Sequence, residues 1–437
     1  MSLPGASQRP RISRSNTAQR AEYDYFTDNP PPKQLEAHSK LAQDFIEFHA
    51  ASNNRVVLIT SGGTTVPLER QTVRFIDNFS AGTRGATSAE YFLEAGYAVI
   101  FLHRQFSLLP YSRHYSHATD CFLDFLSESA DGTVVANQEH QDKMVHVLRK
   151  YNAAKAKNLL LTLPFTTITD YLFVLRSVSQ LMRPLGAHGL LYLAAAVSDF
   201  FVPPTRMVEH KIQSTDAVKK NAPVSPEGSN LGIVDRSPGP EGSPLDTTND
   251  SPGSEDEVFD NFDSSPRVPR SKRLIVDLDP VPKFLKNLVD GWAPEGMIVS
   301  FKLETDPDIL VHKAEYSLER YQHHLVIGNL LSTRKWEVVF VSKDRAVEGS
   351  RMREEWIRVP RQRRGTGVKD WTGKAALLTV GDKVGVADAI TDEKEHPSDP
   401  ADLMGEPEIE IEGLIIPAVA DMHTAHIQAH AKAAPVA

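Results

Sequence analysis

The sequence predicts an α/β fold, in which a mostly parallel sheet carries helices on both faces and has an antiparallel edge extension. An apolar, β-branched run at residues 56–61 ends at Gly62 and Gly63. An amphipathic segment after Gly82 is followed by a second apolar run at 98–102. Together these segments form a strand-loop-helix-strand unit. Apolar runs alternate with helical patterns further along the chain, which is typical of a Rossmann-like sheet covered on both faces.

The loop after the first strand contains a Ser-x-Gly-x-x-Gly pattern at residues 80–85. Glycines let backbone amides approach a phosphate, and the first N–H groups of a helix have no partner within the helix. The pattern therefore indicates a nucleotide-using enzyme, although a turn entering a packed helix fits it equally well. The dinucleotide fingerprint is excluded, because Gly82 comes 20 residues after Gly62 and the second strand ends in His103 and Arg104 without an acid.

The remaining elements follow in order. Further buried strands are predicted at residues 159–163, 189–196, 297–301 and 324–329, with helices at 171–185 and 306–321. Residues 336–341 and 408–416 are predicted to pair as the antiparallel edge, separated by a second polar insertion at 343–406.

Composition predicts a single α/β domain at residues 31–437, preceded by a flexible tail at 1–30. The domain is interrupted at 222–271, where 8 of the 29 prolines lie and 10 acidic residues stand against 3 basic ones. Such a segment cannot bury enough apolar surface to offset its ordering entropy, so we expect a disordered insert.

Several classes of function are disfavoured by composition. A net charge of -9 gives no overall attraction for nucleic acid, and the basic cluster at 361–364 fits a solvated loop. No apolar run is long enough to span a membrane. The single Cys121 suits a reducing compartment. We expect a cytoplasmic protein, with the nucleus left open and mitochondrial import not favoured despite the arginines of the tail.

Small and polar residues gather after several predicted strands, where open sheets of this type bind ligands. They are Gly62 and Gly63, residues 195–199, residues 301–306, and Asn329. Other interpretations remain open, since the alanines at 194–196 can pack against a helix and Asp199 can cap a turn. His423, His426 and His430 share one face of a predicted C-terminal helix, but exposed helix histidines are common and no metal ligand is predicted.

Five motifs in one order resemble those of eukaryotic phosphopantothenoylcysteine synthetases (phosphopantothenate-cysteine ligases). They are ITSGGT at 59–64, VRFIDNFSAG at 73–82, AAAVSD at 194–199, HKIQS at 210–214 and SFKLETD at 300–306. The similarity covers most of residues 55–345. The tail and both insertions have no counterpart in the family pattern.

The resemblance implies an ATP-dependent ligation of 4'-phosphopantothenate with L-cysteine in coenzyme A biosynthesis. ATP converts the carboxylate into an acyl-adenylate with release of pyrophosphate, and the cysteine amine then displaces AMP. Mg²⁺ neutralises the phosphates with little coordination by the protein. The family also implies a homodimer with shared active sites.

The matching positions imply roles for individual residues. Nucleotide-binding positions are Gly62, Ser80, Gly82, Gly85, Phe301 and Asn329. Substrate-binding positions are Asn78, Ala195, Ala196, Asp199 and Arg74, the last reaching across from a second subunit. Lys211 and Asn78 are the catalytic pair. Gln213 and Ser214 replace two lysines that follow Lys211 in bacterial relatives, so a preference for CTP is not implied.

Other interpretations remain open for these residues and for the class of protein. Lys211 also fits an exposed lysine on a mobile loop, and Arg74 also fits a surface ion pair with Glu69 or Asp77. Tyr151 and Lys155 match the Tyr-x-x-x-Lys spacing of a short-chain dehydrogenase that uses NAD(P), although the glycine spacing argues against that class. A non-enzymatic scaffold that recruits partners through the acidic insert is the other alternative.

Overall fold

The computed structural model describes residues 14–115, 122–212, 276–343, 352–360, 390–391 and 407–433. The chain divides into two compact units. The larger unit contains Met1–Thr64, Asn78–Val197 and Pro282–Ala437, and the smaller contains Thr65–Asp77 and Ser198–Val281. The chain therefore passes from the larger unit to the smaller one and back twice.

A nine-stranded sheet forms the centre of the larger unit. Its order is β15-β14-β13-β12-β11-β8-β1-β4-β7, and the six strands from β12 to β7 are parallel. The parallel strands are β1 (Val56–Ser61), β4 (Ala98–Arg104), β7 (Leu160–Phe165), β8 (Gly189–Leu193), β11 (Met297–Glu304) and β12 (Leu325–Leu330). The antiparallel edge is built from β13 (Glu337–Lys343), β14 (Met352–Arg358) and β15 (Ile390–Thr391). A hairpin of β5 (Leu126–Glu128) and β6 (Val134–Ala136) lies outside the sheet.

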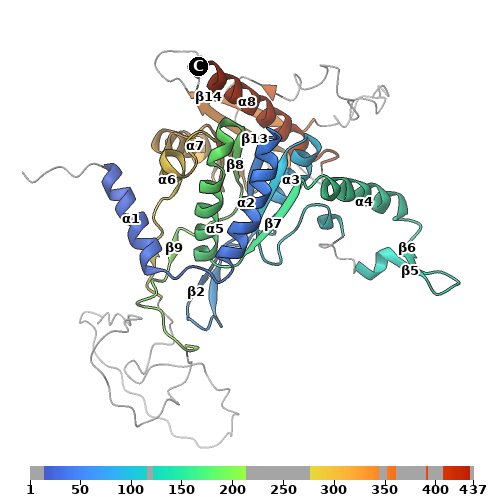
Figure 1. The fold of residues 1–437 in the computed structure, drawn as a ribbon, viewed down its shortest axis with the longest axis horizontal. Coiled ribbons are helices and arrows are strands. Elements are labelled where there is room, and N and C mark those ends of the chain that lie inside the picture. The colour runs from blue at the N-terminus through green and yellow to red at the C-terminus, as the bar shows by residue number, and fades with distance from the viewer. Residues whose placement is uncertain are drawn as a thin grey trace, which may run out of the picture. The chain divides into compact units, whose positions relative to one another are not determined.

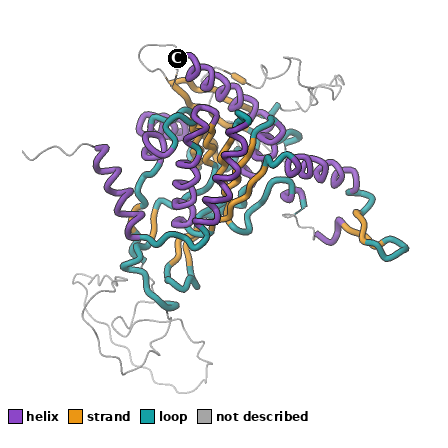
Figure 2. The backbone as a smooth tube through the Cα atoms, viewed as in Figure 1, coloured by secondary structure: helices purple, strands orange, loops and turns teal. Residues whose placement is uncertain are grey.

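Helices surround these strands (Figure 2). The longer ones are α1 (Arg14–Asp28), α2 (Leu35–Ala51), α3 (Thr83–Glu94), α4 (Gln141–Ala156), α5 (Ile168–Leu181), α7 (Pro307–Tyr321) and α8 (Glu412–Ala433). Short helical turns are η1 (Ser112–His114), η2 (Phe122–Phe125), η3 (Arg183–His188), α6 (Leu285–Asn287) and the π-helical η4 (Leu288–Trp292). None of the described helices combines the length and the apolar character that crossing a bilayer requires.

Both faces of the sheet are covered. On one face, α3 and α8 pack with Val57, Ile59 and their neighbours in a single core. On the other face, Leu310 and Leu318 of α7 pack with Val326 of β12. Helices α2 and α5 lie side by side (Figure 1). All six residues of β1 are buried, including the polar Thr60 and Ser61 at its end. Burial on both faces is typical of a strand in the middle of a parallel sheet.

The smaller unit is formed by two short antiparallel pairs. Strand β2 (Thr65–Pro67) pairs with β3 (Phe75–Asp77), and β9 (Phe200–Phe201) pairs with β10 (Asp279–Pro280). Most of the predicted acidic insert, like much of the second insertion, falls outside the described residues. The single interrupted domain at 31–437 therefore stays a prediction.

The α/β class, the mostly parallel sheet and the antiparallel edge are confirmed. Three local predictions are wrong. Residues 14–28 of the predicted tail form α1, because Tyr25 and Phe26 pack against the rings of Phe284 and Trp292. Residues 352–358 of the predicted insertion form β14, the partner of β13. Residues 408–416, predicted as that partner strand, instead lead into α8.

Candidate functional site

The junction between β1 and α3 depends on glycine at three predicted positions. Gly62 has φ of 84° and Gly82, the N-cap of α3, has φ of 83°, a left-handed conformation that glycine adopts without strain. A Cβ on Gly85 would lie 2.4 Å from the Ser61 hydroxyl oxygen. Ser61 is itself fully buried, and its Oγ donates a hydrogen bond to the Gly82 carbonyl at 3.0 Å. The backbone at the start of α3 is thus packed directly against Ser61 of β1.

The first turn of α3 carries no side chain that would compete with an anion for its amides. No side chain caps the helix, and its first turn contains no acidic residue. Ser80 accepts a hydrogen bond from the Gly82 amide at 3.4 Å, so this predicted residue also belongs to the loop. Unpaired amides and the helix dipole together favour a bound anion at such a position.

Residues 194–196 extend β8 along the same edge. The amide of Ala195 donates to the Thr60 hydroxyl at 3.2 Å, and the amide of Ala196 donates to the Gly62 carbonyl at 2.8 Å. Ala194 packs against the core, as the alternative interpretation of the alanines expected, whereas Ala195 and Ala196 lie beside the glycine loop. The structure therefore brings the predicted nucleotide and substrate segments together.

Asn78 joins this edge through its backbone. Its amide donates to the Thr64 carbonyl at 3.1 Å, and a Cβ on Gly63 would overlap the Asn78 carbonyl oxygen. Gly63 is consequently required for the approach of Asn78. The half-buried Asn78 side chain lies where the chain returns to the larger unit, two residues before Ser80.

Phe301 and Asn329 lie on neighbouring parallel strands, β11 and β12. Arg84, which sequence reasoning missed, lies with its guanidinium carbon 5.8 Å from the centre of the Phe301 ring. Its Nη1 donates to Glu412 of α8 at 2.8 Å, and its Nη2 donates to the Arg334 carbonyl. The one signal for Arg84 was its position between Gly82 and Gly85.

In the smaller unit, a buried carboxylate holds Arg74. Glu69 is 0% exposed and accepts hydrogen bonds from the amides of Val73, Arg74 and Ile212 at 2.8–3.2 Å. Nη1 of Arg74 donates to Glu69 at 3.2 Å and to the Ile212 carbonyl at 2.6 Å. Burial alone would raise the pKa of Glu69, but these hydrogen bonds outweigh it and the pKa is lowered.

This arrangement revises the alternative interpretation of Arg74. The ion pair with Glu69 exists, but its carboxylate is buried, so it is not a surface pair. Because Ile212 follows Lys211, the same carboxylate fixes the chain beside the predicted catalytic lysine. The side chain of Lys211 is exposed. Asp199 is also exposed, directly before β9, and its carbonyl accepts a hydrogen bond from Val281 at 2.9 Å.

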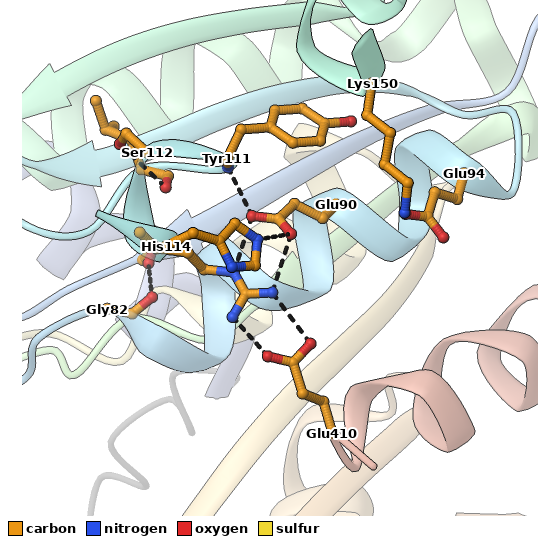
Figure 3. A network of polar contacts seen from close by, with 11 residues as sticks. Gly82, Glu90, Glu94, Tyr111, Ser112, His114, Lys150 and Glu410 are labelled. Atoms are coloured by element: carbon orange, nitrogen blue, oxygen red, sulfur yellow. Dashed lines mark hydrogen bonds and ion pairs between the residues drawn. The ribbon is translucent and has the colours of Figure 1, made fainter. Parts of the chain in front are cut away.

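A second buried carboxylate, Glu90, lies in the middle of α3 (Figure 3). It accepts hydrogen bonds from Arg113 at 2.8 and 2.9 Å, from His114 at 3.1 Å and from the Tyr111 amide at 2.6 Å. Arg113 also donates two hydrogen bonds to Glu410, at the start of α8. Burial opposes the charge, but the bonds from His114 and Arg113 prevail and lower the pKa of Glu90 to about 2.

The C-terminal histidines have structural partners. His423 and His426 are buried, contrary to the expectation of exposed helix histidines, and hydrogen-bond the carbonyls of Ala187 and Glu295. Burial lowers the pKa of His423 to about 4. Within the described ranges, no group of three or more His, Cys, Asp or Glu residues is placed to hold a metal ion.

The dehydrogenase alternative does not fit the structure. Tyr151 and Lys155 lie at the C-terminal end of α4, which leads to the amino end of β7. The glycine loop lies at the carboxyl end of β1. The tyrosine and the glycine loop therefore lie toward opposite ends of the parallel strands. A dehydrogenase needs its tyrosine beside the cofactor.

The fold and this edge define the class of doubly wound α/β proteins with a strand-helix junction suited to a phosphate. No family model matches the chain. It is 46% identical over 341 residues to phosphopantothenate-cysteine ligase CAB2 of Saccharomyces cerevisiae, covering 77% of this chain and 80% of the relative. It is 38% identical over 329 residues to the human phosphopantothenate-cysteine ligase, covering 74% and 88%.

Solved structures lead to the same family. A Cab2 mutant in complex with phosphopantothenate-cysteine aligns with a TM-score of 0.63 at 38% identity, covering 94% of this chain and 99% of that one. The chain belongs to the phosphopantothenate-cysteine ligase family.

Proposed function

We propose that this protein ligates 4'-phosphopantothenate to L-cysteine at the expense of ATP, giving 4'-phosphopantothenoylcysteine in coenzyme A biosynthesis. Membership of the ligase family supports the overall reaction. The observation that carries the nucleotide part is the junction of β1 and α3, where glycines and an uncapped helix N-terminus favour a phosphate.

The proposed reaction has two steps. A carboxylate oxygen of phosphopantothenate attacks the α-phosphorus of ATP, and the bond to the departing pyrophosphate breaks. The cysteine amine then attacks the acyl carbon, loses a proton, and AMP leaves with the electrons of the broken carbon–oxygen bond. Negative charge builds on the phosphates in the first step, so positioned amides and cations accelerate it. Mg²⁺ accompanies ATP as the counter-ion of the triphosphate.

For the nucleotide side we propose roles taken from the matching motifs, and the uncapped start of α3 supports them. The amides at the start of α3 and the loop of Gly62, Ser80, Gly82 and Gly85 bind the phosphates. Phe301 and Asn329 bind the adenosine. Arg84 supports the Phe301 ring from α3, since its guanidinium lies close to that ring and is held by Glu412.

The acyl substrate is assigned to the remaining positions. Asn78, Ala195, Ala196 and Asp199 bind phosphopantothenate, with the Asn78 amide orienting the acyl group. Lys211 screens the phosphates during adenylation. Arg74 contacts the phosphate of a substrate bound to the other subunit of a homodimer, and Glu69 positions it for that contact.

The reaction is tested by coupled pyrophosphate release with phosphopantothenate, cysteine and either ATP or CTP. We expect one AMP and one pyrophosphate for each product molecule, and a higher kcat/KM with ATP. Omission of cysteine should prevent sustained turnover. No product with either nucleotide would refute the ligase assignment, and faster turnover with CTP would refute the nucleotide assignment alone.

Shared active sites are tested by complementation between two inactive variants. Arg74→Ala and Asn78→Ala subunits are co-expressed with different tags, and the mixed dimers are purified. If Arg74 acts across the dimer, one site of each mixed dimer combines both intact residues and activity returns. Verified heterodimers that stay inactive would mean that Arg74 serves its own subunit.

A further inference from the structure

A strained turn follows β4. The Ser107 amide donates to the Arg104 carbonyl at 3.0 Å, which closes a four-residue turn. Its third residue, Phe106, has φ of 68°. Turns with a positive φ at this position favour glycine or asparagine, because a side chain there meets its own backbone. A phenylalanine at this position is therefore conformationally unfavourable.

Packing within the chain does not explain the phenylalanine. Phe106 is 92% exposed, so its ring buries almost no surface against the described residues. A strained residue that gains no packing is typical of a position selected for contact with a ligand. The turn also contains a buried hydroxyl, Oγ of Ser107, without a hydrogen-bond partner in the described part of the chain.

The turn lies against the glycine loop. A Cβ on Gly62 would lie 2.7 Å from Cβ of Arg104, and a Cβ on Gly82 would lie 3.3 Å from both Cβ and Oγ of Ser107. The Leu108 amide donates to the Ala81 carbonyl at 2.9 Å. Phe106 therefore lies in a turn that packs against and hydrogen-bonds the loop before α3, at the carboxyl ends of the parallel strands.

We infer that Phe106 is a ligand contact of this site, whose ring covers the activated acyl-nucleotide and excludes water. The inference rests on the proposed function. In the reaction it prevents, water attacks the acyl carbon and loses a proton, the bond from carbon to the phosphate oxygen breaks, and AMP and the original carboxylic acid are released. Exclusion of water protects reactive intermediates of this kind.

The test separates the strain from the ring. Phe106→Gly removes both, whereas Phe106→Leu keeps the strain and removes only the ring. Gln322→Gly is the matched control, because Gln322 has φ of 59° just after α7, at the opposite edge of the sheet. Both glycine variants should melt at the wild-type temperature or about 1–3 °C above it.

The kinetic outcome distinguishes the variants. We expect Phe106→Gly and Phe106→Leu to release pyrophosphate in excess of product, with less than half of the activated acyl groups reaching cysteine and with the KM for phosphopantothenate raised about tenfold. Gln322→Gly should keep the wild-type ratio of one. A ratio of one in both Phe106 variants, with KM within twofold, would overturn the inference. So would conversion of the dimer to monomers by Phe106→Gly, since the ring would then be a subunit contact.

A fluorescence measurement keeps this inference distinct from the ligase assignment. If wild-type protein forms no product, the proposed function fails. Phe106→Trp would still report a ligand at the turn through a change in emission on addition of ATP and phosphopantothenate, relative to wild-type protein treated in the same way. No change in emission together with no kinetic effect would contradict the contact itself.

Discussion

The two ends of α3 have the same backbone conformation but different surroundings. Gly82 before the helix and Gly96 after it both have φ of 83°. A Cβ on Gly82 would lie 2.9 Å from the Ser61 hydroxyl, whereas nothing lies within 4 Å of a Cβ on Gly96. Glycine at the C-terminal end is explained by conformation alone. At the N-terminal end, the close approach of the Ser61 and Ser107 side chains is a second requirement.

The two ends of α3 also differ in how their backbone groups are hydrogen-bonded. After the helix, the Gly96 amide donates to Leu93 and the Tyr97 amide donates to Phe92, a Schellman arrangement that satisfies the last carbonyls. Before the helix, no side chain caps the first amides. One end of α3 is completed by its own chain, whereas the amides at the other end are uncapped, and the proposed function assigns the nucleotide phosphates to those amides.

The largest expected effect is on the free energy of unfolding, and it comes from Glu90 in the middle of α3, away from both glycines. Glu90→Gln should lower the free energy of unfolding by about 3–5 kcal/mol, because Arg113 loses its buried carboxylate partner and keeps only Glu410, which is partly exposed. Chemical denaturation measures the loss. At a temperature where the variant is folded, kcat/KM for ligation should stay within a few-fold of wild type. A large kinetic loss in a folded variant would show that Glu90 serves the site.

The stability that Glu90 contributes should depend on pH. Its pKa is lowered from 4.5 to about 2, so the contribution is complete above pH 4.5 and is lost as pH falls toward 2. The difference in unfolding free energy between wild type and Glu90→Gln should therefore shrink over this range. Buried His423, with a pKa of about 4, weakens both proteins equally below pH 6.5 and cancels in the difference. A difference that stays constant down to pH 3 would contradict the ion-pair account.

Much of the fold was predictable because local pattern and final environment agree. The run at 56–61 is β-branched and becomes a strand buried on both faces. Prediction failed at 408–416, where closely spaced isoleucines suggest a strand. In the structure Ile411, Ile415 and Val419 are buried at helical spacing. Either period fits so short a segment, and packing on α3 decides between them.

The site was predictable only where its chemistry is local. Gly82 and Gly85 lie in one recognisable motif and Gly62 lies in another one 20 residues earlier, and the structure brings the two motifs together. Arg84 was missed, and Glu69 was expected only as a surface partner of Arg74, because their other partners are remote: Glu412 is 328 residues from Arg84, and Ile212 is 143 residues from Glu69. No local pattern encodes such pairs.

A smaller loss of stability is expected at Gly85, in the first turn of α3. Gly85→Ala places a methyl group 2.4–2.5 Å from atoms of Ser61, so β1 and α3 must separate. Overpacking of this kind costs about 1–3 kcal/mol, although alanine favours helix by itself. Thermal melts should show the loss, and the KM for ATP should rise. Gly96→Ala is the control for the KM alone: it loses stability through its own left-handed strain but should keep the wild-type KM for ATP. An unchanged melting temperature in Gly85→Ala would show that the close approach is dispensable.

The smallest expected effect is at the first residue of α3, where helix stability and ATP affinity should change in opposite directions. Thr83 is the exposed first residue of α3. Thr83→Glu should stabilise the helix by about 0.3–1 kcal/mol through its dipole, yet weaken ATP binding, because the new carboxylate competes with the phosphates. Thr83→Gln is the uncharged control. Tighter binding of ATP to Thr83→Glu than to Thr83→Gln would mean that the phosphates lie elsewhere.

The central claim is that the N-terminal end of α3 binds the nucleotide phosphates. Calorimetric titration of Mg²⁺-ATP into Gly82→Ala and Gly96→Ala tests it most directly, since both variants carry the same left-handed strain, about 1–2 kcal/mol. The account predicts a Kd raised at least about 30-fold for Gly82→Ala, equivalent to about 2 kcal/mol, and a wild-type Kd for Gly96→Ala. Equal Kd values in two folded variants would contradict it.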